Sequence, residues 1–359
     1  MKKIFVLINL SAIACATYAQ DIHFSQYNQT PALVNPALTG MNGTVRACAI
    51  YKEQWKSITT PFTTYGASFE MKFKGSNWDK VDEHLTKIYK KAFSRVAGGL
   101  SMFSDKAGDG GMGTTNVNLS LATFIPLNKA SSLSVGLQGS LVQHKIDYTK
   151  LVFPDQYSGT TYDPTLTQGE DYSSNNFTYP DFAGGIAWTY GYNEKSIGAN
   201  NDFRANAGVS LYHFASPKQK YLTGTGERLT SKLVAHGDFL IGIPHSNVGL
   251  APSFLFEMQD PSKEMLEGMM VKYYFNMDSK YTGFMKRSAI GLGAYYRNND
   301  AMILSGVIEF ENYAIGASYD LNMSRLKTAS SGKGGVEVFL RFVSPNPFLY
   351  QKKSHAKFN

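Results

Sequence analysis

The chain alternates between apolar and small polar residues over many short stretches. In the run 115–125, Val117 and Leu119 alternate with Asn118 and Ser120. A period of two predicts β-strands with one apolar and one polar face. The polar faces carry mainly Ser, Gly, Asn and Thr, which suits a lumen lined with side chains and water.

About fourteen such runs follow one another, separated by clusters of Gly, Asn, Asp, Ser and Pro. They lie at 45–53, 63–73, 96–103, 115–125, 133–144, 182–190, 203–213, 233–243, 248–258, 266–275, 289–296, 301–310, 313–321 and 336–343. An even number of runs of about ten residues is typical of an outer-membrane barrel. Soluble sandwiches have strands of about five or six residues. We therefore predict an all-β fold, an antiparallel outer-membrane β-barrel of about 14 strands with a short N-terminal pre-barrel segment.

The N-terminus has the features of an export signal. A basic start precedes the apolar stretch 4–14, and Ala19 supplies the small residue that a signal peptidase needs. We predict a signal peptide over 1–19; a lipoprotein site at Cys15 is the alternative. Cleavage removes two lysines and lowers the formal net charge from +7 to +5.

The mature chain divides into three expected parts. A pre-barrel segment, 20–42, lies in the periplasm or enters the lumen; the transmembrane barrel covers 43–343, and 344–359 forms a C-terminal tail. Between them, 78–93 has helical spacing of apolar residues opposite a basic face. This helix-like segment is either a plug or turn helix, or a docking helix for a periplasmic partner.

The lengths of the connections predict the orientation. With both ends in the periplasm, the odd-numbered connections are extracellular, and three of them are long: 145–181, 215–231 and 322–335. Three periplasmic connections are short: 126–132, 244–247 and 311–312. This asymmetry is expected of outer-membrane barrels, although 297–300 is a tight outer turn and 74–95 a long periplasmic connection. The tyrosine-rich loop 145–181 is either an adaptable contact surface or simply an ordered outer loop.

Two charged residues of the first strand predict which face lines the lumen. Arg46 and Lys52 share a face with Cys48. A charge facing lipid near mid-bilayer costs about 2–4 kcal/mol, so this face is expected to point inward. The last strand must lie beside the first, and its Glu337 is the predicted lumenal partner of Arg46.

Composition narrows the function further. The chain is 13% aromatic and only 18% charged, against about 25% charged in average soluble proteins. Its seven histidines lack zinc-site spacing. Ser140 and His144 share a strand face about 13 Å apart, too far for a direct hydrogen bond, so an outer-membrane hydrolase is disfavoured. The stretch 105–111 is a glycine-rich turn rather than a calcium loop. We expect no catalytic site, metal or cofactor, and no nucleic-acid partner despite the basic charge.

An ordered series of short motifs spans about residues 22 to 343. It includes His23-Phe24-Ser25-Gln26, Asn35-Pro36-Ala37, Gly40, Arg46, Gln54-Trp55, Gly98-Gly99-Leu100, Tyr212-His213, Tyr296-Arg297, Ser318-Tyr319-Asp320, Gly335 and Glu337. The series resembles the PorP/SprF family of outer-membrane proteins in the type IX secretion and gliding-motility system of Bacteroidetes. The tail after the last strand departs from the family, which usually ends with that strand.

The resemblance implies a non-enzymatic barrel that aids secretion or surface anchoring of an adhesin-like type IX cargo protein. It implies three further contacts: a periplasmic peptidoglycan-binding lipoprotein, ring components of the system, and outer-membrane lipid. The candidate partner-contact or structural motif comprises His23, Phe24, Gln26, Asn35, Pro36, Arg46 and Trp55. The alternative function is a porin, or a channel for small or hydrophobic substrates, with an N-terminal plug. An open lumen favours the channel, and a filled lumen favours the adaptor.

Overall fold

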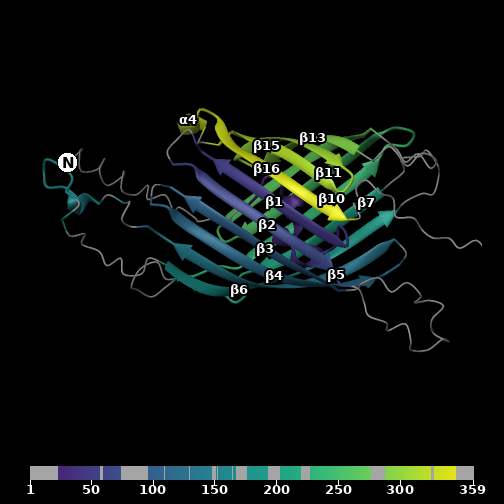
Figure 1. The fold of residues 1–359 in the computed structure, drawn as a ribbon, viewed down its shortest axis with the longest axis horizontal. Coiled ribbons are helices and arrows are strands. Elements are labelled where there is room, and N and C mark those ends of the chain that lie inside the picture. Colours follow the sequence, from purple (N-terminus) through teal and green to yellow (C-terminus); the bar gives the residue numbers. More distant parts are fainter. Residues whose placement is uncertain are drawn as a thin grey trace, which may run out of the picture.

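The computed structural model describes most of the predicted barrel and the segment before it (Figure 1). The described residues are 23–56, 60–73, 96–108, 110–128, 130–147, 151, 153–163, 165–166, 176–192, 203–219, 227–275, 288–324 and 327–344. Three predictions lie outside them: the signal peptide at 1–19, the helix-like segment 78–93, and the C-terminal tail beyond Ser344.

Within the described residues, fourteen antiparallel strands form one closed barrel. They are β1 (Val45–Gln54), β2 (Phe62–Lys72), β3 (Val96–Ala107), β4 (Met112–Pro126), β5 (Ser131–Lys145), β6 (Asn176–Tyr192), β7 (Phe203–Tyr212), β10 (Lys232–Gly242), β11 (Val248–Gln259), β12 (Ser262–Tyr274), β13 (Ser288–Arg297), β14 (Ala301–Phe310), β15 (Tyr313–Asn322) and β16 (Lys333–Ser344). Each strand pairs with its neighbours in sequence, and β16 pairs with β1 to close the sheet. The predicted fold class is confirmed.

The two ends of the barrel differ. At the loop end, the connections carry η5 (Pro154–Gln156), the two-stranded sheet of β8 (Lys218–Gln219) and β9 (Glu227–Arg228), and α4 (Lys327–Ser330). At the opposite, terminal end, β1 begins and β16 ends. Figure 1 shows α4 at one end of the barrel and the arrowhead of β16 at the other. None of the described helices has the length and apolar character needed to span a membrane.

The alternation of the sequence becomes an apolar outside and a polar inside. On β4, Leu119 is 60% exposed, whereas its neighbour Ser120 is 1% exposed. The same inversion holds on β5, where Leu137 is exposed and Gln138 is buried. An outward apolar band with a polar interior is the arrangement that a bilayer requires of a barrel.

Exposed aromatic side chains mark both edges of this band. At the terminal end they are Phe73, Trp188, Tyr273, Phe275, Phe310 and Tyr313; at the loop end they are Tyr65, Phe182, Phe214, Tyr296 and Tyr319. Aromatic girdles of this kind lie at the two membrane–water interfaces of outer-membrane barrels.

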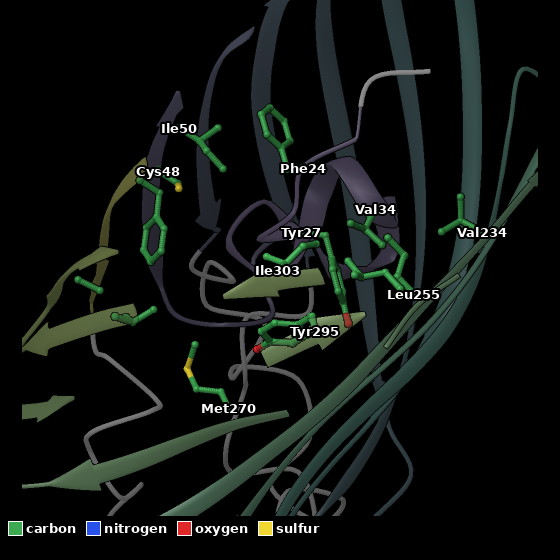
Figure 2. Close-up of a cluster of buried hydrophobic side chains, with 14 of the residues drawn as sticks. Phe24, Tyr27, Val34, Cys48, Ile50, Val234, Leu255, Met270, Tyr295 and Ile303 are labelled. Carbon is green, nitrogen blue, oxygen red and sulfur yellow. The ribbon is translucent and has the colours of Figure 1, made fainter. Parts of the chain in front are cut away.

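Residues 23–44 fold inside the barrel. They form η1 (Tyr27–Gln29), α2 (Pro31–Val34) and η2 (Pro36–Leu38), and the two latter helices each begin with a proline, which suits the first helical position. Figure 2 shows Tyr27 and Val34 among side chains of the surrounding strands, with Tyr295 beside Tyr27. The sequence left open whether this segment lies in the periplasm or the lumen, and the structure places it in the lumen.

Candidate functional site: the N-terminal segment in the lumen

The N-terminal segment runs along the lumen from one end of the barrel to the other. At the loop end, the Lys52 ammonium near the end of β1 donates to the His23 carbonyl at 3.0 Å. At the terminal end, the Thr44 amide donates to the Ser344 carbonyl at 2.9 Å, just before β1 begins. The described segment therefore begins at the loop end, although the sequence predicted both ends of the chain at the terminal, periplasmic end, and it leads directly into the first strand.

A buried carboxylate holds the first residues of the segment. The amides of Ser25 and Gln26 donate to the two oxygens of Glu337, at 2.8 Å and 2.7 Å. Lys52 lies 3.9 Å from the same carboxylate, and both charged side chains are at most 2% exposed. Glu337 thus satisfies two backbone donors while Lys52 balances its charge.

A second set of charged side chains surrounds the Ser25 hydroxyl. This hydroxyl donates to Asp320 at 2.8 Å and accepts from Arg297 at 2.8 Å. Arg297 also lies 3.3 Å from Asp320, 3.4 Å from Glu264 and 3.0 Å from Asp300. One guanidinium on β13 thereby joins carboxylates from three other parts of the barrel wall to the segment.

Two arginines donate hydrogen bonds to Gln29 in the middle of the segment. Arg46 donates to the Gln29 carbonyl at 2.5 Å, and Arg341 donates to its side-chain oxygen at 2.8 Å. Arg46 lies 3.7 Å from Glu70, and Arg341 lies 2.8 Å from Glu309. Each arginine therefore links the N-terminal segment to a carboxylate of the barrel wall.

The predicted pair of Arg46 with Glu337 is wrong, although both residues face the lumen. The β1–β2 register places Arg46 opposite Glu70, and the β1–β16 register places Lys52 opposite Glu337. Arg46 and Lys52 are six positions apart, about 20 Å along the strand. The closing strand supplies the carboxylate, but to the other basic residue of β1.

Asn35 connects the segment to the opposite wall. Its side-chain oxygen accepts from the Ala37 amide at 2.9 Å, and its side-chain nitrogen donates to the carbonyls of Ile186 and Val209 at 3.0 Å and 3.3 Å. The His236 Nε2 lies 3.1 Å from that nitrogen. Asn35 is 0% exposed, so every bond it makes is shielded from water.

Glycines of the wall make room for this contact. A Cβ on Gly136 of β5 would lie 2.3 Å from the Pro36 carbonyl carbon, and one on Gly185 of β6 would lie 2.1 Å from the Asn35 side-chain oxygen. The lumen wall on this side is therefore shaped to the backbone of the segment, because a larger residue at either position would collide with it.

Further polar contacts hold the backbone of the segment. Ser210 and Tyr212 of β7 donate to the carbonyls of Val34 and Leu33, at 2.7 Å and 2.9 Å. The Gly40 amide donates to Glu70 at 2.7 Å. Because water is excluded around these groups, losing one partner would leave a buried polar atom unsatisfied.

The Tyr27 phenol belongs to the same arrangement. It donates to Asp238 at 3.1 Å. This bond links η1 to β10 inside the lumen.

Most of the candidate motif is internal. Phe24, Gln26, Asn35, Pro36 and Arg46 are buried, and His23 is partly exposed. Trp55 is also partly exposed; it follows β1 and packs edge-on against Phe62, with ring centroids 4.8 Å apart. Burial favours a structural role over direct partner contact for most of this motif.

The residues considered for chemistry make other contacts. The two ring nitrogens of His144 lie 2.9 Å from the Thr114 hydroxyl and 3.2 Å from the Tyr179 hydroxyl. Ser140 instead accepts from Gln138 at 3.2 Å. In the part of the chain that the structure describes, no three acidic, His or Cys residues converge in a possible metal site.

The sequence predicted inward-facing charges at Arg46, Lys52 and Glu337, but three further buried charges of the wall were missed. Glu70, Glu309 and Arg341 are buried and contact the segment or its partners. Each occupies the inward phase of an alternating run, so the argument applied to Arg46 would have found them. Lys272 belongs to the same group of charges, and its ammonium lies 3.1 Å from a carboxylate oxygen of Glu309.

A cavity of about 90 Å³ remains beside the segment. It is lined by residues of the segment, including Tyr27 and Gln29, and by wall residues including Lys272, Glu309 and Arg341. The N-terminal segment thus leaves a small space, lined by both apolar and polar side chains, on the β10–β14 side of the lumen.

A closed antiparallel barrel with an apolar outer band and a polar interior defines an outer-membrane barrel protein. The family model described as "Type IX secretion system membrane protein PorP/SprF" matches residues 16–342. The chain belongs to this family, and it is an outer-membrane component of the type IX secretion system. The family is one of secretion-system components and is not a known enzyme family.

Several solved structures are similar to this chain at low sequence identity. A FadL homologue from Pseudomonas aeruginosa is 10% identical, with a TM-score of 0.39, covering 88% of this chain and 94% of that one. BamA from Haemophilus ducreyi lacking POTRA domains 1-3 is 9% identical, with a TM-score of 0.39, covering 84% and 70%. The TodX deltaS2S3 mutant, a monoaromatic hydrocarbon channel, is 8% identical, with a TM-score of 0.41, covering 86% and 91%. No curated protein matches the chain significantly.

Proposed function

We propose that this protein is a non-enzymatic adaptor that helps an adhesin-like type IX cargo protein reach the cell surface or remain there. The observation that carries the proposal is the occupied lumen. Residues 23–44 lie within the barrel and are held by buried carboxylates, arginines and amide contacts. A porin requires an open aqueous passage, whereas a plugged barrel is suited to acting as a fixed platform in the membrane.

The two ends of the barrel suit different partners under this proposal. The loop end carries η5, β8, β9 and α4, and Tyr157 and Tyr162 are exposed there. We assign this end to the extracellular side and to the cargo. The terminal end, where residues 41–44 are partly exposed, is assigned to the periplasmic lipoprotein and the ring components.

We also propose a cellular role, from the family and from the sequence of the leader. The protein is exported by the leader at 1–19 and serves a gliding bacterium of the Bacteroidetes by anchoring a motility adhesin. Each of these points rests on the family and on the sequence of the leader.

Deletion of the gene, followed by comparison of the surface proteome, tests the proposal. A tagged barrel is purified in parallel from detergent-solubilised envelope. The adaptor predicts loss of one large surface protein, and recovery of that protein or of a peptidoglycan-binding lipoprotein with the barrel. An unchanged surface without a recovered partner would contradict it and favour the channel.

Deletion of residues 22–40 in a barrel that still assembles separates the roles of the segment. If the segment supports cargo binding, cargo display falls although the barrel reaches the membrane. Unchanged cargo display would show that the segment only closes the lumen. The matched control is Asn28→Ala, which alters a partly exposed residue, removes the bond that its side-chain oxygen accepts from the Gln29 side chain at 3.0 Å, and keeps the side chains that link the segment to the barrel wall.

A further inference from the structure

The barrel wall has a local interruption between β10 and β11. The strands pair at Asp238 with Ser253 and again, in the same register, at Ile241 with Leu250. Phe239 and Leu240 therefore do not pair with β11, where Pro252 and Ala251 lie opposite them, although both still pair with β7 on the other side. Pro252 has no amide hydrogen to donate, which explains why regular pairing fails at this point.

A groove lies at this interruption on the lipid-facing side. It has a volume of about 570 Å³, within the roughly 300–1,000 Å³ of typical ligand pockets. Its outward-facing lining consists of Phe239, Pro252, Phe254, Ala294, Tyr296 and Met302. The short side chains of Pro252 and Ala294 leave space between the larger ones.

The groove reaches deep into the wall. Ser253 and Tyr295 point to the lumen and are buried, yet they line both this groove and the lumen cavity. Phe239 also lines both. Gly268 faces the lumen beside them, and a Cβ there would lie 2.4 Å from the Tyr295 ring. Only a thin layer of side chains separates the groove from the lumen.

One acidic side chain borders the groove. Glu267 is exposed on the outward side of β12, opposite Phe254 on one neighbour and Tyr296 on the other. Tyr296 belongs to the loop-end aromatic girdle and stands one residue before the end of β13. Glu267 therefore lies near the depth of the lipid head groups, where a carboxylate can meet a cationic group.

We propose that this groove binds a lipid with an amine head group, with one acyl chain in the groove and the ammonium paired with Glu267. The groove opens within the apolar band, where acyl chains are the surrounding medium. A carboxylate attracts an ammonium by a charge-assisted hydrogen bond and repels an anionic head group. Apolar lining and acidic rim together specify this class of lipid.

The test measures lipid retained by the purified full-length barrel. The barrel is exchanged into vesicles of phosphatidylethanolamine or of phosphatidylglycerol with identical acyl chains, extracted into detergent, and analysed by native mass spectrometry. The wild type is expected to retain one phosphatidylethanolamine per barrel, with about tenfold weaker retention of phosphatidylglycerol, as for one lost charge-assisted contact. Equal retention of the two lipids would overturn the proposal.

Two variants locate the lipid. Ala294→Phe fills the groove and is expected to reduce retention about tenfold. Ala317→Phe, on the exposed lipid-facing side of β15 away from the groove, is the matched control and keeps wild-type retention. Glu267→Gln is expected to remove the head-group preference while the acyl chain still binds. Equal loss in Ala294→Phe and Ala317→Phe, or an unchanged preference in Glu267→Gln, would refute the assignment; heat-modifiable migration confirms that each variant is folded.

Discussion

The Glu337 carboxylate is the most informative point at which to perturb the plugged lumen. Glu337→Gln leaves Lys52 buried without its charged partner and weakens the bonds from the Ser25 and Gln26 amides. Removing one partner of a buried ion pair costs about 3–5 kcal/mol. We expect a loss of unfolding free energy of this size, because water does not reach a site where both side chains are at most 2% exposed.

Guanidinium unfolding of the barrel in phospholipid vesicles measures this loss. The matched control is Glu53→Gln on the same sheet, since Glu53 pairs at 3.5 Å with the largely exposed Lys56 and a surface pair contributes only about 0–1 kcal/mol. In double-mutant cycles, Lys52→Met combined with Glu337→Gln is expected to show a larger coupling than Arg46→Met combined with Glu337→Gln. Equal losses in Glu337→Gln and Glu53→Gln, or the reverse order of couplings, would refute this reasoning.

Three further outcomes follow from the contacts of the segment. Asn35→Ala leaves buried backbone groups without their partner and is expected to lower unfolding free energy by about 1–3 kcal/mol in the same assay. Gly136→Ala collides with the segment and is expected to make the segment accessible to added protease. The control is Gly139→Ala, which is expected to leave cleavage unchanged because its Cβ would have its nearest neighbour at 3.9 Å. Glu309→Gln leaves two buried cations facing each other and is expected to cost about 3–5 kcal/mol; a loss under 1 kcal/mol would contradict the geometry.

The sequence was sufficient to predict the barrel because the bilayer imposes a simple rule on it. Every wall residue must suit either lipid or lumen, so a period of two identifies each strand and its inward face. Arg46 shows how far that rule extends, since its inward orientation was predicted and is confirmed by its burial. Strand ends were less certain: β6 begins at Asn176, six residues before the predicted run, because a strand can extend beyond the membrane without apolar alternation.

Partners across the lumen were harder to predict than orientation. Alternation places Arg46 and Glu337 on the lumenal face but does not specify their positions along the barrel axis. The register between β1 and β16 makes Lys52 the neighbour of Glu337. The path of residues 23–44 also left no periodic signal, since most residues of its short helices are buried, whichever way they face, and are fixed by the surrounding wall. His23 and Asn35 were recognised as a motif, yet their role required the wall residues that hold them.

Planar-bilayer conductance of the intact barrel, compared with a barrel lacking residues 22–40, tests the central claim most directly. If the N-terminal segment closes the lumen, the intact protein shows little conductance and the shortened protein forms stable open pores. Large, stable conductance of the intact, folded protein would contradict the plugged lumen and support a channel instead.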